Sequence, residues 1–280
     1  MLRAGGVNTV KLLAILVATG CQTYAQHQAA LVPHMTPMMT DGQPLAARGQ
    51  LDLGASNLVD LAQPRAGTVN VGDAVPGTQL HAAAQLRAAT DPALSLRLVY
   101  ENGLVDTAEK VSSSQPSVGR NVPGYGVGAA YSFDLHSGWR LALDAEVLFW
   151  NVPWVQYDTC ISEGCEGITT VARDSTVVPT LAGGITESYR HGSFIAFGGL
   201  TLRNQPTTIE KDETTVPASP YVDNGPLNAV LHAGVAFDLD FIKLSVFVDK
   251  ELIGDPIDYG TALAAMVAIP LGQPDRRAAP

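Results

Sequence analysis

The chain has 280 residues, of which 46% are hydrophobic and only 16% are charged, and its formal net charge is −10. This acidic balance argues against a nucleic-acid binder, because such proteins use basic patches to displace phosphate counterions. Beyond residue 20 the sequence has no uninterrupted apolar run near the roughly 18 residues that a membrane helix needs. The hydrophobic residues are therefore dispersed among polar ones.

Residues 1–25 are predicted to be an export signal. Arg3 and Lys11 form a thin positive region, residues 12–18 form an apolar stretch, and small residues follow, which is the order of a secretory signal peptide. Cleavage after Ala25 would be ordinary. The alternative is cleavage before Cys21, where an Ala-Thr-Gly-Cys sequence resembles the lipobox of bacterial lipoproteins, with alanine where that family usually has leucine. Cys21 is then a candidate for lipidation.

Residues 26–48 hold three prolines and a cluster of methionines and show no sustained period, which predicts a linker. From residue 49 to residue 272, apolar and polar residues alternate in segment after segment, as in strands with two unlike faces. Ten strands are predicted, at 49–61, 78–89, 94–104, 124–135, 139–152, 175–190, 192–204, 228–240, 241–252 and 259–272. Most have the roughly 9 to 11 residues that a tilted strand needs to cross a bilayer.

The connections between these strands alternate in length. Long segments rich in proline, glycine, serine or threonine occupy 62–77, 105–123, 153–174 and 205–227, whereas the intervening connections are short and residues 253–258 are intermediate. Transmembrane barrels have long extracellular loops and short periplasmic turns, so an even number of strands predicts both termini in the periplasm. Aromatic residues near the strand ends predict two interfacial girdles. They are Phe133, Trp139, Tyr189, Phe194 and Phe241 near the turns, and Tyr100, Tyr125, Trp150, Trp154 and Tyr259 near the loops.

Cys160 and Cys165 lie in the third long connection. In an exported chain whose Cys21 is lipidated or removed, they form a pair, and Gly164 permits the turn that would bring them together. We therefore expect a disulfide. Two thiols without a neighbouring histidine or third cysteine are too few for structural zinc, so neither a metal nor a cofactor is expected.

Over roughly residues 49–272 the sequence resembles bacterial outer-membrane β-barrels as a class. The resemblance implies an all-β, antiparallel up-and-down transmembrane barrel of about ten strands, in contact with outer-membrane lipid and followed by a polar tail at 273–280. The last strand departs from the class because it lacks a terminal aromatic residue.

The predicted lumen carries charges of both signs, which favours ion pairs that plug the barrel over a selective filter. The predicted lumen-lining residues are Arg87, Arg97, Glu101, Asp134, Arg140, Asp144, Glu146, Arg203, Lys243 and Asp249. We therefore expect a non-enzymatic structural or scaffold component of the cell envelope, whose long loops or N-terminal linker contact envelope proteins. A narrow passive pore for small solutes is the alternative.

A barrel hydrolase is the second alternative. The omptin proteases resemble this architecture, but the sequence lacks their Asp-x-His element, and barrel esterases need a serine, a histidine and an acid. His81 and His232 are predicted to point inward without an obvious serine partner. No catalytic residue is predicted.

Overall fold

The computed structural model describes residues 24–33, 41–43, 47–60, 75–104, 118–160, 168–208, 222–239, 241–253 and 260–272. The strands are β1 (Tyr24–Ala30), β2 (Gly49–Asp60), β3 (Thr78–Arg87), β4 (Leu94–Leu104), β5 (Asn121–His136), β6 (Trp139–Cys160), β7 (Ile168–His191), β8 (Phe194–Thr208), β9 (Val222–Asp238), β10 (Lys243–Ile253) and β11 (Thr261–Leu271). Among these residues, no helix has the length and hydropathy that crossing a membrane would require.

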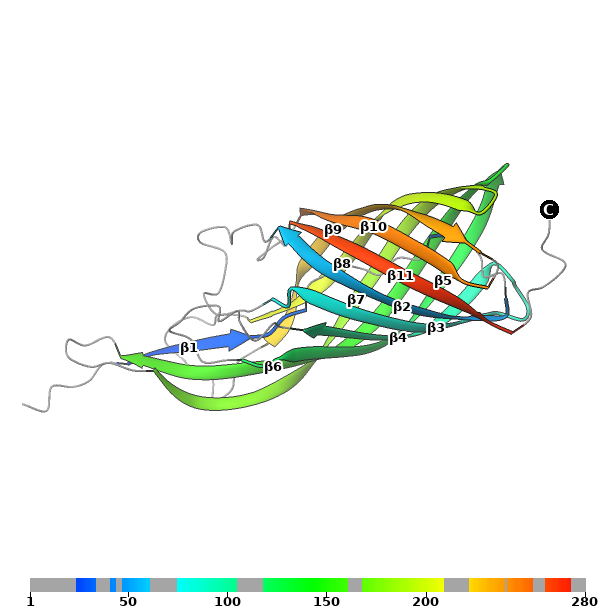
Figure 1. Ribbon diagram of the computed structural model, residues 1–280. Coiled ribbons are helices and arrows are strands. Elements are labelled where there is room, and N and C mark those ends of the chain that lie inside the picture. Colours follow the sequence, from blue (N-terminus) through cyan, green and yellow to red (C-terminus); the bar gives the residue numbers. More distant parts are fainter. Residues whose placement is uncertain are drawn as a thin grey trace, which may run out of the picture.

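Strands β2 to β11 form a closed antiparallel barrel of ten strands (Figure 1). Each strand pairs with its sequence neighbours, and β11 pairs with β2 along its whole length, which closes the ring. Closure matters because a sheet edge without partners is costly where water is excluded. The predicted fold class is confirmed.

The barrel has two unlike ends. The connections from β2 to β3, β4 to β5, β6 to β7, β8 to β9 and β10 to β11 lie at one end, which we call the loop end. The short connections lie at the other end, the turn end, where β2 also begins and β11 ends. Between β5 and β6 the turn is only Ser137 and Gly138, and Gly138 adopts a φ of 79° that suits glycine.

The two faces of the barrel wall differ as the alternation predicts. Leucine, valine and phenylalanine side chains on the outward face are exposed, including Leu98, Phe149 and Val246, whereas polar side chains on the inward face are buried. This arrangement suits strands that face lipid outside and a polar lumen inside.

Aromatic side chains gather near both ends of the outward face. At the turn end the rings of Trp139 and Tyr189 lie 5.1 Å apart, and at the loop end those of Tyr100 and Tyr125 lie 5.1 Å apart. Trp150 and Trp154 do not belong to the loop-end girdle, because even-numbered residues of β6 point inward and both rings are buried. Tyr259 lies outside the described residues.

Strands β6 and β7 are longer than predicted. The predicted loop 153–174 is instead largely a hairpin, in which β6 continues to Cys160 and β7 begins at Ile168. Pro153 favours a loop in the sequence, yet it pairs with Ser175 of β7, and its carbonyl accepts a hydrogen bond from the Leu31 N–H. A proline is tolerated in a strand where no partner needs its missing N–H.

Strand β1 lies beside the loop-end extension of β6 (Figure 1). Tyr24 pairs with Cys160 and Ala30 with Trp154, whereas β5 pairs with β6 only as far as Trp150, so β1 continues the track of β5. Part of the predicted linker 26–48 is therefore a strand. The sequence predicts both termini on the turn side, but β1 is at the loop end, because it gains backbone partners on the far end of β6.

Candidate functional site in the barrel lumen

The loop end of the lumen is filled by an apolar cluster that includes the chain after β1. Leu31 and Val32 are fully buried there and pack among inward side chains of five barrel strands, β3 to β7. We call this the loop-end cluster; its buried members are Ala30, Leu31, Val32, Ala83, Val99, Val122, Leu148, Trp150, Val152, Trp154 and Val178. Gly124 lies against the Trp150 ring, where an added Cβ would come within 2.7 Å of it.

Below this cluster, Glu101 is the centre of a buried polar network. Its carboxylate lies 3.3 Å from the Arg203 guanidinium, and each side chain is 1% exposed. Gln79 donates a hydrogen bond of 2.6 Å to Glu101, and Nδ1 of His81 lies 3.5 Å from it. Arg203 also stands 5.5 Å from the centroid of the Trp150 ring, within the range of a cation–π contact.

A second group of charges lies beside this network. The Arg97 guanidinium is 3.6 Å from Asp144 and 3.8 Å from Glu146, so one cation serves two carboxylates. These pairs join β4 to β6 across β5, at the level where β5 carries Gly128. Small residues on β5 leave room for the long side chains that reach over it.

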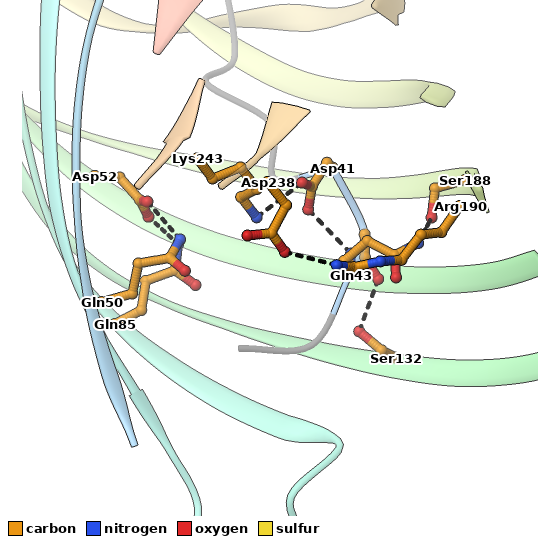
Figure 2. Close-up of polar contacts among 11 residues, drawn as sticks. Asp41, Gln43, Gln50, Asp52, Gln85, Ser132, Ser188, Arg190, Asp238 and Lys243 are labelled. Carbon is orange, nitrogen blue, oxygen red and sulfur yellow. Dashed lines mark hydrogen bonds and ion pairs between the residues drawn. The ribbon is translucent and has the colours of Figure 1, made fainter. Parts of the chain in front are cut away.

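The turn end of the lumen holds residues 41–43 (Figure 2). Nζ of Lys243 lies 2.8 Å from the Asp41 carboxylate, and Gln43 donates a hydrogen bond of 2.7 Å to the Ser188 hydroxyl. Ser132 donates one of 3.1 Å to the carbonyl of Gly42, whose φ of 72° favours glycine. These contacts fix residues 41–43 to three barrel strands, β5, β7 and β10.

The barrel wall beside this segment supplies its own polar contacts. Asp52 of β2 accepts hydrogen bonds from Gln50 and from Gln85, and Arg190 of β7 lies 2.9 Å from Asp238 of β9 (Figure 2). The turn end is therefore lined by paired polar groups.

Residues 31–33 and 41–43 both lie inside the barrel. Each segment contacts inward side chains, the first at the loop end of the lumen and the second at the turn end.

His232 has a hydroxyl neighbour, but no carboxylate among the described residues is hydrogen-bonded to its ring. Its Nε2 lies 3.2 Å from the Thr186 hydroxyl, and it reaches β7 across Gly199 of β8, where a Cβ would collide with the ring. Asp249 is paired with His232 in the β9–β10 register, yet within the described part of the chain neither Asp249 oxygen nor His232 Nδ1 has a hydrogen-bond partner. The carboxylate–imidazole–hydroxyl chain that a hydrolase needs is not assembled.

The structure places the predicted lumen residues in two groups. One group lies inside the barrel and consists of Arg97, Glu101, Asp144, Glu146, Arg203, Lys243 and Asp249. The other lies toward the turn end and consists of the half-buried Arg87 and the rim pair of Arg140 with Asp134, which are 3.0 Å apart and 30% and 75% exposed.

Sequence reasoning did not select several residues that complete the lumen. Gln79 and Asp52 could have been predicted from the alternation of apolar and polar residues, because both occupy inward-facing positions, Gln79 on β3 and Asp52 on β2. Asp41, Gln43 and Leu31 carried no such signal, since their stretch has no period and gains its contacts only from distant strands.

The cysteine predictions lie outside the described residues. Cys21, Cys165 and the side chain of Cys160 are not described. Across the described part of the chain, no group of three or more histidine, cysteine, aspartate or glutamate side chains could hold a metal ion.

No protein-family model and no curated protein matches the sequence. Among solved structures, the chain is similar to the neisserial surface protein A, with 14% identity, a TM-score of 0.32, and coverage of 80% of this chain and 96% of that one. It is also similar to the KdgM porin (9% identity, TM-score 0.33, coverage 80% and 99%) and to the outer membrane protease OmpT of Escherichia coli (9%, 0.33, 80% and 91%). The barrel assignment rests on the strand pairing of this chain itself.

Proposed function

We propose that this chain is a non-enzymatic outer-membrane β-barrel that serves as a structural or scaffold component of the bacterial cell envelope. The observation that carries the proposal is the filled lumen. Apolar packing occupies its loop end, buried ion pairs its middle, and the Asp41–Lys243 contact its turn end. Contacts that cross the lumen at three levels support a barrel that does not conduct solutes and whose useful surface is the outside.

An outer-membrane location is supported by the outward face of the wall. Large apolar side chains are exposed around the ring, on strands long enough to cross a bilayer. A contiguous apolar belt of this kind needs a lipid or protein cover. We take the loop end as the extracellular end because long loops face outward in barrels of this kind. The hairpin β6–β7, extended by β1, then offers the surface for contacts with envelope or surface partners.

Planar-bilayer recording tests the closed lumen. The mature chain, reconstituted from detergent, is expected to produce no stable conductance steps at low applied voltage, because side-chain contacts cross the lumen at its loop end, middle and turn end. Heat-modifiable migration in electrophoresis confirms that the inserted protein is folded. Regular conductance steps from the intact chain would contradict the proposal.

A narrow passive pore is the second candidate, and one observation favours it. The turn-end contacts of residues 41–43 are few and polar, namely an ion pair and two hydrogen bonds, so the segment is held less firmly there than at the loop end. A variant that lacks residues 26–46 is the direct comparison. Conductance from this variant alone would identify the N-terminal segment as the element that closes the lumen.

A further inference from the structure

We infer that this barrel displays the N-terminal end of its mature chain at the loop end, on the opposite side of the membrane from its C-terminal end. Which compartment each end occupies rests on the proposed membrane location, but the placement of the two chain ends at opposite ends of the barrel does not. The inference gives the barrel a further role, because any group attached ahead of β1 is carried to the loop-end side of the membrane.

The first observation is the place of β1. Seven registered pairs, from Tyr24 with Cys160 to Ala30 with Trp154, fix β1 to the part of β6 beyond its contact with β5, and the five from Gln26 onward are kept by a chain cleaved after Ala25. That part of β6 leads into the 161–167 connection at the loop end. Because β1 is antiparallel to β6, its first residue lies beside the last residue of β6, farthest from the turn end.

The second observation is the path that follows. After β1, the Leu31 N–H donates a hydrogen bond of 2.9 Å to the Pro153 carbonyl, and Leu31 and Val32 enter the loop-end cluster. Asp41 and Gln43 then contact Lys243 and Ser188 near the start of β2. Of the described residues after β1, the first group therefore lies inside the barrel at the loop end and the second inside it at the turn end.

The third observation is that both ends of this path are anchored by different forces. At the loop end the segment is held by a backbone ladder and by burial of apolar side chains. At the turn end it is held by an ion pair that is largely shielded from water. Salt screens such a shielded ion pair much less than an exposed one, so both anchors should persist at raised ionic strength.

The experiment places one short epitope at three positions in otherwise identical full-length chains. The first version carries it directly before Gln26, behind an ordinary cleavable export signal. The second carries it between Lys211 and Asp212, in the connection from β8 to β9 at the loop end, and the third carries it after Pro280. Antibody binding is measured by flow cytometry on intact cells and again after permeabilisation.

The expected result is that the N-terminal and loop epitopes bind antibody on intact cells to a similar extent, within about twofold, whereas the C-terminal epitope binds only after permeabilisation. Loss of the N-terminal signal on intact cells, with the loop signal retained, would overturn the inference. If the C-terminal epitope instead binds on intact cells and the loop epitope binds only after permeabilisation, the proposed orientation of the barrel is wrong. In that case the inference still requires the N-terminal epitope to bind antibody under the same conditions as the loop epitope.

A cross-linking control tests whether the inserted epitope has displaced β1 or residues 41–43 from their positions in the barrel. In a background in which Cys21, Cys160 and Cys165 are replaced by serine, two cysteine pairs are introduced. Q28C with Q156C is oxidised directly, because paired strand positions have the Cα separation that a disulfide needs. D41C with K243C is bridged by a short bifunctional thiol reagent, because the long Lys243 side chain spans much of the distance between the two backbones. Both cross-links are expected to form in membrane-inserted protein, as judged by altered migration in electrophoresis. Failure of both pairs in folded protein would show that the segment is elsewhere and would overturn the inference.

Discussion

Glu101 and Arg203 illustrate how single residues hold this lumen together. Each has been removed from water, which is expensive for an isolated charge, and each recovers part of that cost from the other and from Gln79 or Trp150. The pair joins β4 to β8 across the barrel. Removing one partner leaves the other charge buried without compensation, which costs more than the pair itself contributes.

The R203A variant is therefore expected to lower the free energy of unfolding by about 3 kcal/mol. Urea unfolding of the barrel in detergent micelles measures this. The double variant E101Q with R203M removes both charges and keeps the volume, so it is expected to lose less than the single variant. Greater loss in the double variant would contradict the explanation.

R190A is the matched control on the barrel rim. Arg190 lies 2.9 Å from Asp238, but its side chain is 40% exposed. A pair in contact with water contributes at most about 1 kcal/mol, so the free energy of unfolding of R190A should stay close to that of the parent chain. An equal loss of unfolding free energy in R190A and R203A would mean that burial of the ion pair does not determine how much its removal destabilises the barrel.

At the scale of strands, the β6–β7 hairpin projects past the ring, and β1 covers the edge of β6 there. Replacing His27 and Gln28 together by proline removes two successive N–H groups, one of which must face β6. Backbone amides of residues 154–160 are then expected to exchange with solvent at least about tenfold faster, which corresponds to about 1.4 kcal/mol of lost protection. Hydrogen exchange followed by mass spectrometry measures this.

The same double substitution at Arg276 and Arg277, in the polar tail, is the control for this variant, and it should leave the exchange unchanged. The melting temperature of the barrel should change little in either variant, because the ten-strand ring closes without β1. If the hydrogen-exchange rates of residues 154–160 are unchanged in the β1 variant, β1 does not protect the backbone amides of β6.

Alternation along the sequence predicted all ten barrel strands, since the inward and outward environments differ at every second residue. It failed where local pattern and distant partners disagree. Pro153 indicated a loop, but the strand continues through it because β7 and Leu31 supply partners. Residues 24–30 carry no strong pattern and form a strand only through β6, a contact between positions more than a hundred residues apart. The lumenal place of residues 41–43 is equally non-local.

For the molecule as a whole, the exposed apolar wall dominates behaviour in solution. The chain without residues 1–25 is expected to stay folded only with lipid or detergent. Unboiled samples should migrate faster than boiled ones, and circular dichroism should report sheet. The reason is that the apolar outward face has no cover in water. A stable, monomeric sheet protein in detergent-free buffer would contradict the membrane assignment.

The closure between β11 and β2 also constrains the order in which this protein can assemble. The ring is sealed by its final strand against the strand that directly follows residues 41–43. Once sealed, the ring has no side entrance, and the loop-end cluster and the Glu101–Arg203 pair obstruct lengthwise entry. We therefore expect residues 31–33 and 41–43 to lie against the inner surface of the curling sheet before the last pairing forms, so that the later strands close around chain that is already in place.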